Sequence, residues 1–391
     1  MPSAVLVTAE DGSAPTESAP TESAPSDAEK ELAESIDDIL NELNLAEIER
    51  FINSFDYSQR SVFGASSAAD KIRAVVSGEI QLDYGNFFTY ILEIAGVSVL
   101  GYLPSMLAIL AIAVAVNMLH SAKGRLASES VGDIVSFAGV GLITAILAVQ
   151  ITMLTASARG LIVSLQAQMN AVFPVILTLM AASGGAGSAG VYQPAVAVLA
   201  SGIMGIIVAL ILPLFILSSV FTVVGNLSDT VKLKKMSAFF MTACKWLLGT
   251  AFFLFIAFLS VQGITASIYD GVSVRTAKFA ISKYVPVIGG YLSEGFNLIM
   301  AGSVLVKNAV GLTAVVILFL SALPTVASVA VFNLSLHLTA AVAEPLGDKR
   351  ISNILSELAK NTGTLAAILL GAAFLYFIFL ILVICTGNPA L

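Results

Sequence analysis

The stretch PAVAVLASGIMGIIVALILPLFILSSVFT, residues 194–222, contains no charged side chain and is long enough to cross a bilayer. It lies inside a longer run, residues 160–228, without any Asp, Glu, Lys or Arg, and residues 308–343 and 361–391 are also free of them. A helix crosses the hydrocarbon core with about 20 apolar residues. These runs are continuously apolar and do not alternate as barrel strands do. They predict an all-α, polytopic helical integral membrane protein.

The composition of the whole chain agrees with this class. Hydrophobic residues make up 57% of the 391 residues and charged residues 12%, whereas soluble domains carry roughly 25% charged residues. The net charge of −7 comes from residues 1–57, where fourteen acids face only Lys30 and Arg50, so the remainder is mildly basic. This distribution argues against nucleic-acid binding. Cys244 and Cys385 lie in or beside apolar segments and indicate neither a disulfide framework nor a metal site.

Two regions precede the predicted membrane domain. Residues 1–26 are acidic and contain the repeat SAPTESAPTESAPS at 13–26, which predicts a disordered tail. Residues 27–86 carry apolar residues at helical spacing, which predicts short amphipathic helices outside the membrane. These helices either extend the tail towards a partner or fold back on the protein's own surface. Residues 87–391 form the predicted transmembrane domain.

Six segments are predicted to cross the membrane. They lie near residues 97–119, 134–155, 194–222, 247–263, 309–335 and 363–386. The glycine-rich stretch 171–190 is predicted to be re-entrant or half of a hairpin, and Pro213 and Pro324 each kink or divide a long segment. The expected number of transmembrane helices is therefore about six to eight. Residues 235–246 and 350–360, which follow basic pairs, are predicted to be interfacial amphipathic helices.

The distribution of Lys and Arg predicts the orientation. With the N-terminus outside, eight basic residues fall in inner loops and five in outer loops, as the positive-inside rule favours. The inner residues are Lys123, Arg125, Lys232, Lys234, Lys235, Lys349, Arg350 and Lys360, and the outer ones are Arg159, Arg275, Lys278, Lys283 and Lys307. This orientation requires export of the N-terminal tail, so we expect a removed signal segment or a misplaced start codon.

A glycine motif does not predict a nucleotide site. Gly185, Gly187 and Gly190 spell GxGxxG within ASGGAGSAG. A dinucleotide site needs a preceding strand and an acid about 20 residues further on. Here a membrane-type run precedes the glycines and the next acid is Asp229. Small residues that let helices or a turn approach closely are the better interpretation, and no cofactor is expected.

The chain also lacks the residues of an enzyme or of an ordinary ion-coupled transporter. Neither His120 nor His337 has a carboxylate close in sequence. Transporters usually keep an acid or base inside the bundle, and none of the predicted spans contains one. Asn333 and His337 either line a polar path or make hydrogen bonds between helices. We therefore predict a protein that is not an enzyme and has no catalytic or metal-binding residues.

The stretch SVQGITASIYDGVSVRTAKFA, residues 260–280, interrupts membrane-type sequence with one acid and two bases. Asp270 and Gly271 predict a turn. From residue 272 onwards the apolar residues follow a helical period, and Arg275 and Lys278 share a different face. This pattern predicts a basic amphipathic helix at an interface, stopped by Pro286. It marks 263–308 as an interfacial, extracytoplasmic segment.

The residue pattern of this stretch resembles that of a known family. The pattern SVQG-x-TA-x-x-x-DG-V-S-V-R-TAKF, followed by VPVIG at 285–289, is similar to that of the stage III sporulation protein AE family. Further matches are SVLVKNAVG at 303–311, which contains Lys307, LTLMAASGG at 177–185 and LNLAEIERF at 43–51. The resemblance covers most of residues 40–386.

The resemblance implies an endospore-forming bacterium and a multi-pass protein of the mother-cell membrane that surrounds the forespore. It implies membership of an eight-protein set, A to H, that forms a secretion-like channel complex with a forespore membrane protein and is required for sporulation. The partners implied are the other proteins of the stage III sporulation A operon. Membrane lipid is a further expected contact, and a homo-oligomer is an open expectation. The A member resembles secretion ATPases and would supply the energy.

On this basis the chain is expected to be a membrane platform or export-gate-like component. The segment 263–308 is expected to form a collar that docks ring-forming partners. Its candidate interface residues are Asp270, Gly271, Arg275, Lys278, Pro286 and Lys307. One alternative is a small-solute transporter or channel acting on its own, with Asn333 and His337 on the path. Another is a lateral scaffold that conducts nothing.

Overall fold

A computed structural model describes residues 27–64, 67–78, 84–121, 129–227, 233–284, 289–346 and 349–386. Within these ranges every regular element is a helix, which confirms the predicted all-α class. The N-terminal helices are α1 (Asp27–Glu42), α2 (Ala46–Asn53), α3 (Tyr57–Phe63) and α4 (Ala68–Val76). The long helices are α5 (Tyr84–Ser121), α6 (Glu129–Met180), α10 (Lys234–Tyr284), α11 (Gly289–Leu346) and α12 (Lys349–Cys385).

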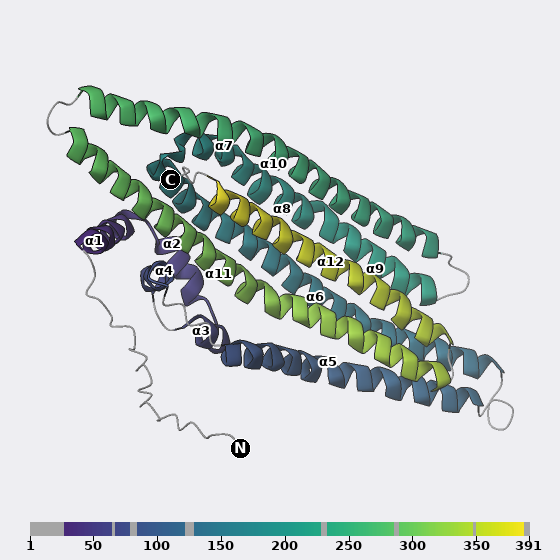
Figure 1. The fold of residues 1–391 in the computed structure, drawn as a ribbon. Helices are drawn as coiled ribbons and strands as arrows, with labels where there is room; N and C mark the ends of the chain where they lie inside the picture. Colours follow the sequence, from purple (N-terminus) through teal and green to yellow (C-terminus); the bar gives the residue numbers. More distant parts are fainter. Residues whose placement is uncertain are drawn as a thin grey trace, which may run out of the picture.

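The chain between α6 and α10 is an irregular helix with three wider, π-type turns. Its segments are η1 (Ala181–Gly185), α7 (Ala186–Ala197), η2 (Val198–Ile203), α8 (Met204–Ile206), η3 (Ile207–Ile211) and α9 (Leu212–Leu227). Gly184 in η1 has φ +92°, a left-handed conformation that glycine adopts without strain. At this residue the chain reverses, and α7–α9 return alongside α6 (Figure 1). The stretch 171–190 thus contains the turn of a helical hairpin, one of the two forms predicted for it.

Five apolar helical runs in the described residues are long enough to span a membrane. They are Gly85–Leu119, Ile134–Gly225, Lys234–Val261, Asn297–Pro345 and Arg350–Cys385. The second run contains the reversal at Gly184 and therefore supplies two helices of the bundle. The chain is a multi-pass helical membrane protein, and the described helices agree with the lower end of the predicted range of six to eight.

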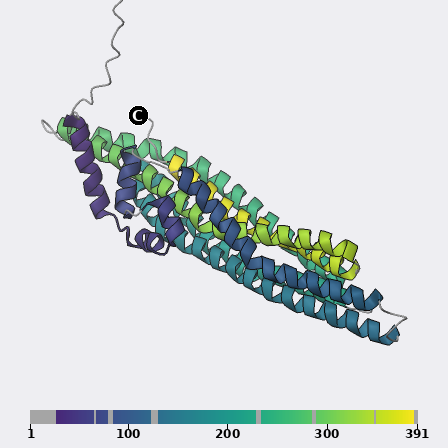
Figure 2. The same cartoon turned by 90° about the horizontal axis from the view of Figure 1, so that it is seen from below.

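Three helices are far longer than a bilayer is thick. α6 has 52 residues, α10 has 51 and α11 has 58. At 1.5 Å per residue they measure about 75–87 Å, against about 30 Å for the hydrocarbon core. A membrane cannot cover their whole length even when they are tilted. The bundle is accordingly elongated, as two perpendicular views show (Figures 1 and 2).

This continuity corrects two predictions of separate elements. Residues 235–246 and 350–360 are not independent interfacial helices, because they belong to the N-terminal parts of α10 and α12. The turn predicted at Asp270-Gly271 is absent, since α10 runs through both residues to Tyr284. A turn signal of two residues does not stop a helix that is formed on both sides of it, because extending a helix costs less than starting a new one. α10 ends at Tyr284 and α11 begins at Gly289, and the predicted stop at Pro286 lies outside the described residues.

The two ends of the bundle differ in their connections. The C-terminal ends of α5, α9 and α11 and the N-terminal ends of α6, α10 and α12 lie at one end, which we call the basic end (Figure 1). Residues 122–128, 228–232 and 347–348 lie outside the described residues, but the flanking Lys234, Lys235 and Arg350 are exposed there. The opposite end, which we call the hairpin end, holds the η1 turn, the C-terminal ends of α10 and α12 and the N-terminal end of α11 (Figure 1).

The basic residues predicted for outer loops require a correction. Arg159 lies inside α6, Arg275, Lys278 and Lys283 lie inside α10, and Lys307 lies inside α11. These residues are predicted to lie in loops because a charged residue that ends an apolar run indicates the edge of the membrane. In the structure the helix continues past the charged residue. The long helices therefore carry these residues without any loop.

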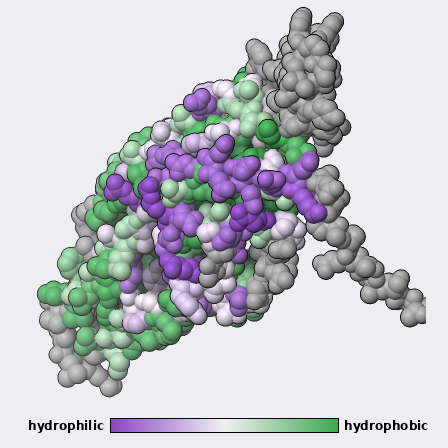
Figure 3. All heavy atoms as spheres, turned by 90° about the vertical axis from the view of Figure 1, so that its left-hand side faces the viewer, coloured by the Kyte–Doolittle hydropathy of each residue, from purple (hydrophilic) through white to green (hydrophobic). Residues whose placement is uncertain are grey.

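The helices α1–α4 fold back on the bundle, the second of the two arrangements predicted for residues 27–86. Ile36 on α1 and Ile72 on α4 are buried in the common core. α1 packs directly on α11, because a Cβ added to Gly302 would lie 3.2 Å from Cδ1 of Ile39. Arg73 on α4 ties this layer together through a 2.8 Å ion pair with Asp37 on α1. Hydrophilic side chains gather over this end of the molecule, whereas hydrophobic ones dominate the flanks (Figure 3).

A carbonyl that a proline leaves without its helical donor joins α3 and α5 to the bundle. Pro324 has no backbone N–H, so the carbonyl of Leu320 one turn earlier in α11 loses its helical donor. That carbonyl instead accepts hydrogen bonds from Nε2 of Gln59 at 2.8 Å and from the hydroxyl of Tyr90 at 3.1 Å. Gln59 belongs to α3 and Tyr90 to α5. The proline thereby provides an acceptor that anchors α3 and α5 to α11.

This arrangement predicts that the two donors substitute for each other. The single variants Gln59→Ala and Tyr90→Phe are each expected to lower the unfolding free energy by less than about 1 kcal/mol. The double variant leaves a buried carbonyl without a donor and is expected to lose about 2–3 kcal/mol. Thermal unfolding in detergent measures both. In a Pro324→Ala background, where the helix supplies its own donor, the extra loss should disappear, and its persistence would contradict this assignment.

Candidate functional site

The predicted interface residues on α10 lie in the part of the helix nearest the hairpin end. Helical spacing places Gly271, Arg275 and Lys278 along one stripe of the helix, with Asp270 adjacent to it. Their side chains and Pro286 lie outside the described side chains, so only their positions along the backbone are described. In both views α10 and α11 extend beyond the end of α12 and form a projecting pair of helices (Figures 1 and 2).

Lys307 does not share this surface, which corrects its assignment as an interface residue. Its side chain is fully buried, at 0% exposure, between α11 and its neighbours. Its Nζ donates a 2.7 Å hydrogen bond to the carbonyl of Thr386, just after the last residue of α12. Terminal carbonyls of a helix lack helical donors and carry partial negative charge, which a cation stabilises. Lys307 therefore joins α11 to the end of α12.

A tightly packed seam surrounds Lys307. Gly311, one helical turn further on, lies so close to α12 that an added Cβ would overlap Cγ1 and Cδ1 of Ile384. The hydroxyl of Tyr192 on α7 lies 3.3 Å from Oγ1 of Thr386. Ser303, one turn before Lys307, is also fully buried. We call Tyr192, residues 303–311 and residues 384–386 the Lys307 seam, and it contains the SVLVKNAVG stretch.

The bond at Thr386 also fixes how far α11 projects. Because Lys307 lies level with the end of α12, residues 289–306 of α11 extend beyond it. At 1.5 Å per residue this projection is about 27 Å long. α1 packs on its base at Gly302. The base of the projecting helices is thus supported by α1 and by the end of α12.

Asn333 and His337 are not brought together. Nδ2 of Asn333 donates a 2.5 Å hydrogen bond to the carbonyl of Ala359, and so lies between α11 and α12. His337 is exposed on the outer surface of α11, between the exposed Leu334 and Leu338. For Asn333 the geometry matches interhelical hydrogen bonding, the second of the two roles predicted for it.

A polar network near the basic end was not predicted from the sequence. Oγ1 of Thr222 lies 2.6 Å from Oγ of Ser237 and accepts a 2.8 Å hydrogen bond from Nδ2 of Asn361. Ser218 donates to the carbonyl of Ser237 at 3.0 Å. All four residues are buried and they join α9, α10 and α12. Small hydroxyl and amide side chains commonly hold membrane helices together in this way.

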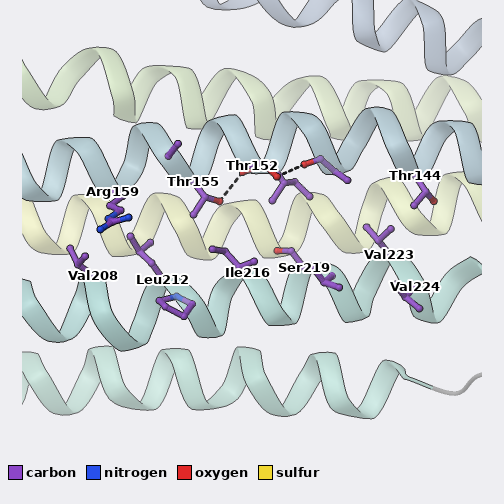
Figure 4. Close-up of a pocket in the computed structure, with 15 residues that line it drawn as sticks. Thr144, Thr152, Thr155, Arg159, Val208, Leu212, Ile216, Ser219, Val223 and Val224 are labelled. Carbon is purple, nitrogen blue, oxygen red and sulfur yellow. Dashed lines mark hydrogen bonds between the residues drawn. The ribbon is translucent and has the colours of Figure 1, made fainter.

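An apolar groove lies between α6 and α9. It has a volume of about 500 Å³ and is lined by the residues drawn in Figure 4. Arg159 lies at one end and Thr144 at the other, with Leu212 and Ile216 between them (Figure 4). The hydroxyls of Thr152 and Thr155 bond back to α6 carbonyls at 2.8 and 2.7 Å. The lining offers an apolar surface and one cation but no acid–base pair.

Among the described residues, no group of three or more His, Cys, Asp or Glu could hold a metal ion. Cys244 is buried, Cys385 is exposed and neither is in a disulfide. The polar residues are concentrated in three places: the Lys307 seam, the buried network that joins α9, α10 and α12, and the projecting pair of helices α10 and α11. These features define a polytopic helical membrane protein with an extended hydrophilic end.

Comparison with known proteins places the chain within a family. The family model of stage III sporulation protein AE matches residues 66–387, so the chain belongs to the stage III sporulation protein AE family. The chain is 29% identical over 221 residues to stage III sporulation protein AE of Bacillus subtilis (strain 168). That match covers 56% of this chain and 55% of the relative, so the chain spans about half the length of the curated relative it matches. No solved structure matches.

Proposed function

We propose that this sporulation protein is the membrane platform, or export-gate-like component, of a transenvelope channel complex between mother cell and forespore. In this proposal it lies in the mother-cell membrane around the forespore and acts without catalysing a reaction. The other proteins of the stage III sporulation A operon and a forespore membrane protein are its partners. The basic end faces the mother-cell cytoplasm, in keeping with the positive-inside rule.

The observation that carries this proposal is the projecting hairpin of α10 and α11. Helices of 51 and 58 residues cannot be contained in a bilayer, so one end must stand outside it. The basic end carries the short, positively charged connections, which leaves the hairpin end to face the space between the two membranes. There it presents a stripe with Gly271, Arg275 and Lys278 to a partner. The hydrophilic α1–α4 layer adds a second polar surface beside it (Figure 3).

Solute transport by the chain alone is the second candidate, but it lacks a comparable observation. Asn333 is engaged with Ala359, and His337 faces outward. The two candidates differ in liposome flux. A platform conducts nothing until its partners are added, whereas flux through liposomes that contain only the purified chain would support a transporter.

Charge reversal on the hairpin tests the platform directly. The double variant Arg275→Glu, Lys278→Glu should still insert into the membrane, because both residues lie outside the apolar run that ends at residue 269. We expect at least a tenfold loss of co-purified A-operon proteins from sporulating cells, since like charges across an interface repel. Membrane fractionation and thermal unfolding of the variant serve as the insertion and folding checks.

The matched control is Lys283→Glu, a reversal on the same helix but off the stripe of Gly271, Arg275 and Lys278. Lys283→Glu should recover partners at nearly the level of the unmodified chain. The single variant Arg275→Glu, which changes the charge by the same amount, should recover fewer. Normal recovery of partners by the double variant would overturn the docking role of this stripe.

A further inference from the structure

A second groove lies between α10 and α12, on a different face from the one in Figure 4. Lys245, Gly249 and Phe252 of α10 and Lys360, Gly363 and Ala367 of α12 line it, and its volume is about 550 Å³. The two helices run in the same direction from the basic end, so the two lysines lie at the same end of the groove (Figure 1). The lining changes from cationic at that end to small and apolar along its length.

The two ammonium groups have no counter-charge in the described structure. Lys245 and Lys360 are both exposed. The acid closest to them along α12, Glu357, is held by Lys234 in a 2.9 Å ion pair. Within the described residues neither Lys245 nor Lys360 makes an ion pair or a hydrogen bond. Two cations on one groove therefore favour an anionic ligand.

The position along both helices matches the headgroup region of a bilayer. Lys245 immediately precedes the charge-free run 246–269, and Lys360 immediately precedes the charge-free run 361–391. Trp246, beside Lys245, is 73% exposed. Tryptophan is enriched where the hydrocarbon core meets the headgroups. The lysines thus mark the membrane boundary nearest the basic end, and the groove continues from them into the hydrocarbon.

The glycines give this groove room for a chain. A Cβ added to Gly249 meets no atom within 4 Å, so the space beside it is open. At Gly363 the nearest atom would be Nδ2 of Asn333 at 3.8 Å, an ordinary contact. A Cβ at either position therefore fits without a clash. A cationic mouth with an open apolar channel below it matches the shape of a phospholipid.

We propose that this groove binds an anionic phospholipid. The phosphate lies between Lys245 and Lys360, and an acyl chain lies along Gly249, Gly363 and Phe252. Basic pockets between transmembrane helices on the cytoplasmic side bind anionic headgroups in this manner. The site is independent of the hairpin and of the partners proposed for it.

The single tryptophan of the chain makes the site directly measurable. Trp246 lines a neighbouring pocket that shares Lys245 and Gly249 with this groove, so an acyl chain that carries bromine and binds along Gly249 is expected to quench its fluorescence. The purified full chain is titrated in mixed micelles with brominated phosphatidylglycerol or with brominated phosphatidylcholine. We expect phosphatidylglycerol to be preferred by about tenfold or more, since each lysine near the headgroup contributes roughly fivefold.

Three variants separate the two parts of the site. Lys245→Gln with Lys360→Gln should reduce the preference to near one while phosphatidylcholine quenching stays unchanged. Gly249→Leu should weaken quenching by both lipids, because it fills the channel. Lys235→Gln removes an exposed lysine of the same helix that does not line the groove and should keep the full preference. Circular dichroism confirms that each variant is folded.

Two results would overturn the proposal. Equal quenching by the two lipids in the unmodified chain would show that the groove does not select an anionic headgroup. Relief of phosphatidylglycerol quenching by inorganic phosphate at about 10 mM, a concentration well above that of the lipid, would assign the lysines to free phosphate instead. Phosphate without an acyl chain is expected to compete poorly.

Discussion

Replacing Lys307 with glutamate is expected to lower the unfolding free energy by about 3–5 kcal/mol, the largest effect of any single substitution considered. The side chain is fully buried and its Nζ donates to the Thr386 carbonyl at 2.7 Å. Glutamate would replace the only donor that reaches this carbonyl from position 307 by a second acceptor, so a buried carboxylate would face a buried carbonyl oxygen. It would also remove a cation from the C-terminus of α12, where the helix dipole favours one.

Thermal unfolding of the purified chain in detergent, followed by circular dichroism, measures this effect. Lys307→Met is the matched control, because it retains most of the apolar length and removes the ammonium group without adding an acceptor. Its expected loss is about 1–3 kcal/mol. An unchanged midpoint for Lys307→Glu would contradict the buried position of this residue, and Met and Glu variants of equal stability would contradict the extra cost of placing a carboxylate beside the Thr386 carbonyl.

Gly311→Leu is expected to lower the unfolding free energy by about 1–3 kcal/mol. Gly311 is buried where α11 meets α12, and an added Cβ would overlap the side chain of Ile384. The helices would have to separate at this point, which would also stretch the hydrogen bond of Lys307 one turn away. The loss is therefore expected to exceed that of the same change at Gly249, where a Cβ meets nothing within 4 Å.

A compensating change tests whether the contact is the cause. Ile384→Ala removes the atoms that the new side chain would meet. The double variant should regain at least half of the stability lost by Gly311→Leu. If Ile384→Ala adds its own loss instead, α11 and α12 do not meet at these two residues.

Much of the fold could be predicted from the positions and lengths of the apolar runs. The predicted spans fall within the helical segments of the structure to within one residue. These predictions succeeded because the length and apolarity of a run of about 20 residues are local properties of the sequence. The prediction of a turn at Asp270-Gly271 was wrong because a helix formed on both sides of two residues continues through them more readily than it stops and starts again.

The internal sites could not be predicted in the same way. Lys307 was assigned to a surface because its sequence neighbours give no sign of the Thr386 carbonyl, which lies 79 residues away along the chain. The acceptors at Leu320 and Ala359 likewise receive their donors from other helices. A lone polar residue in an apolar run has the same local appearance whether it faces lipid, water or another helix.

The sequence by itself determined the class of this protein, a multi-pass helical membrane protein of the stage III sporulation protein AE family. Continuous apolar runs allow only helices in a bilayer, because each backbone group must find its partner within its own segment. Tertiary structure alone decided how far each helix runs, which polar residues are buried and where the ends project. These outcomes depend on contacts between distant segments, such as Lys307 with Thr386 and Gln59 with Leu320.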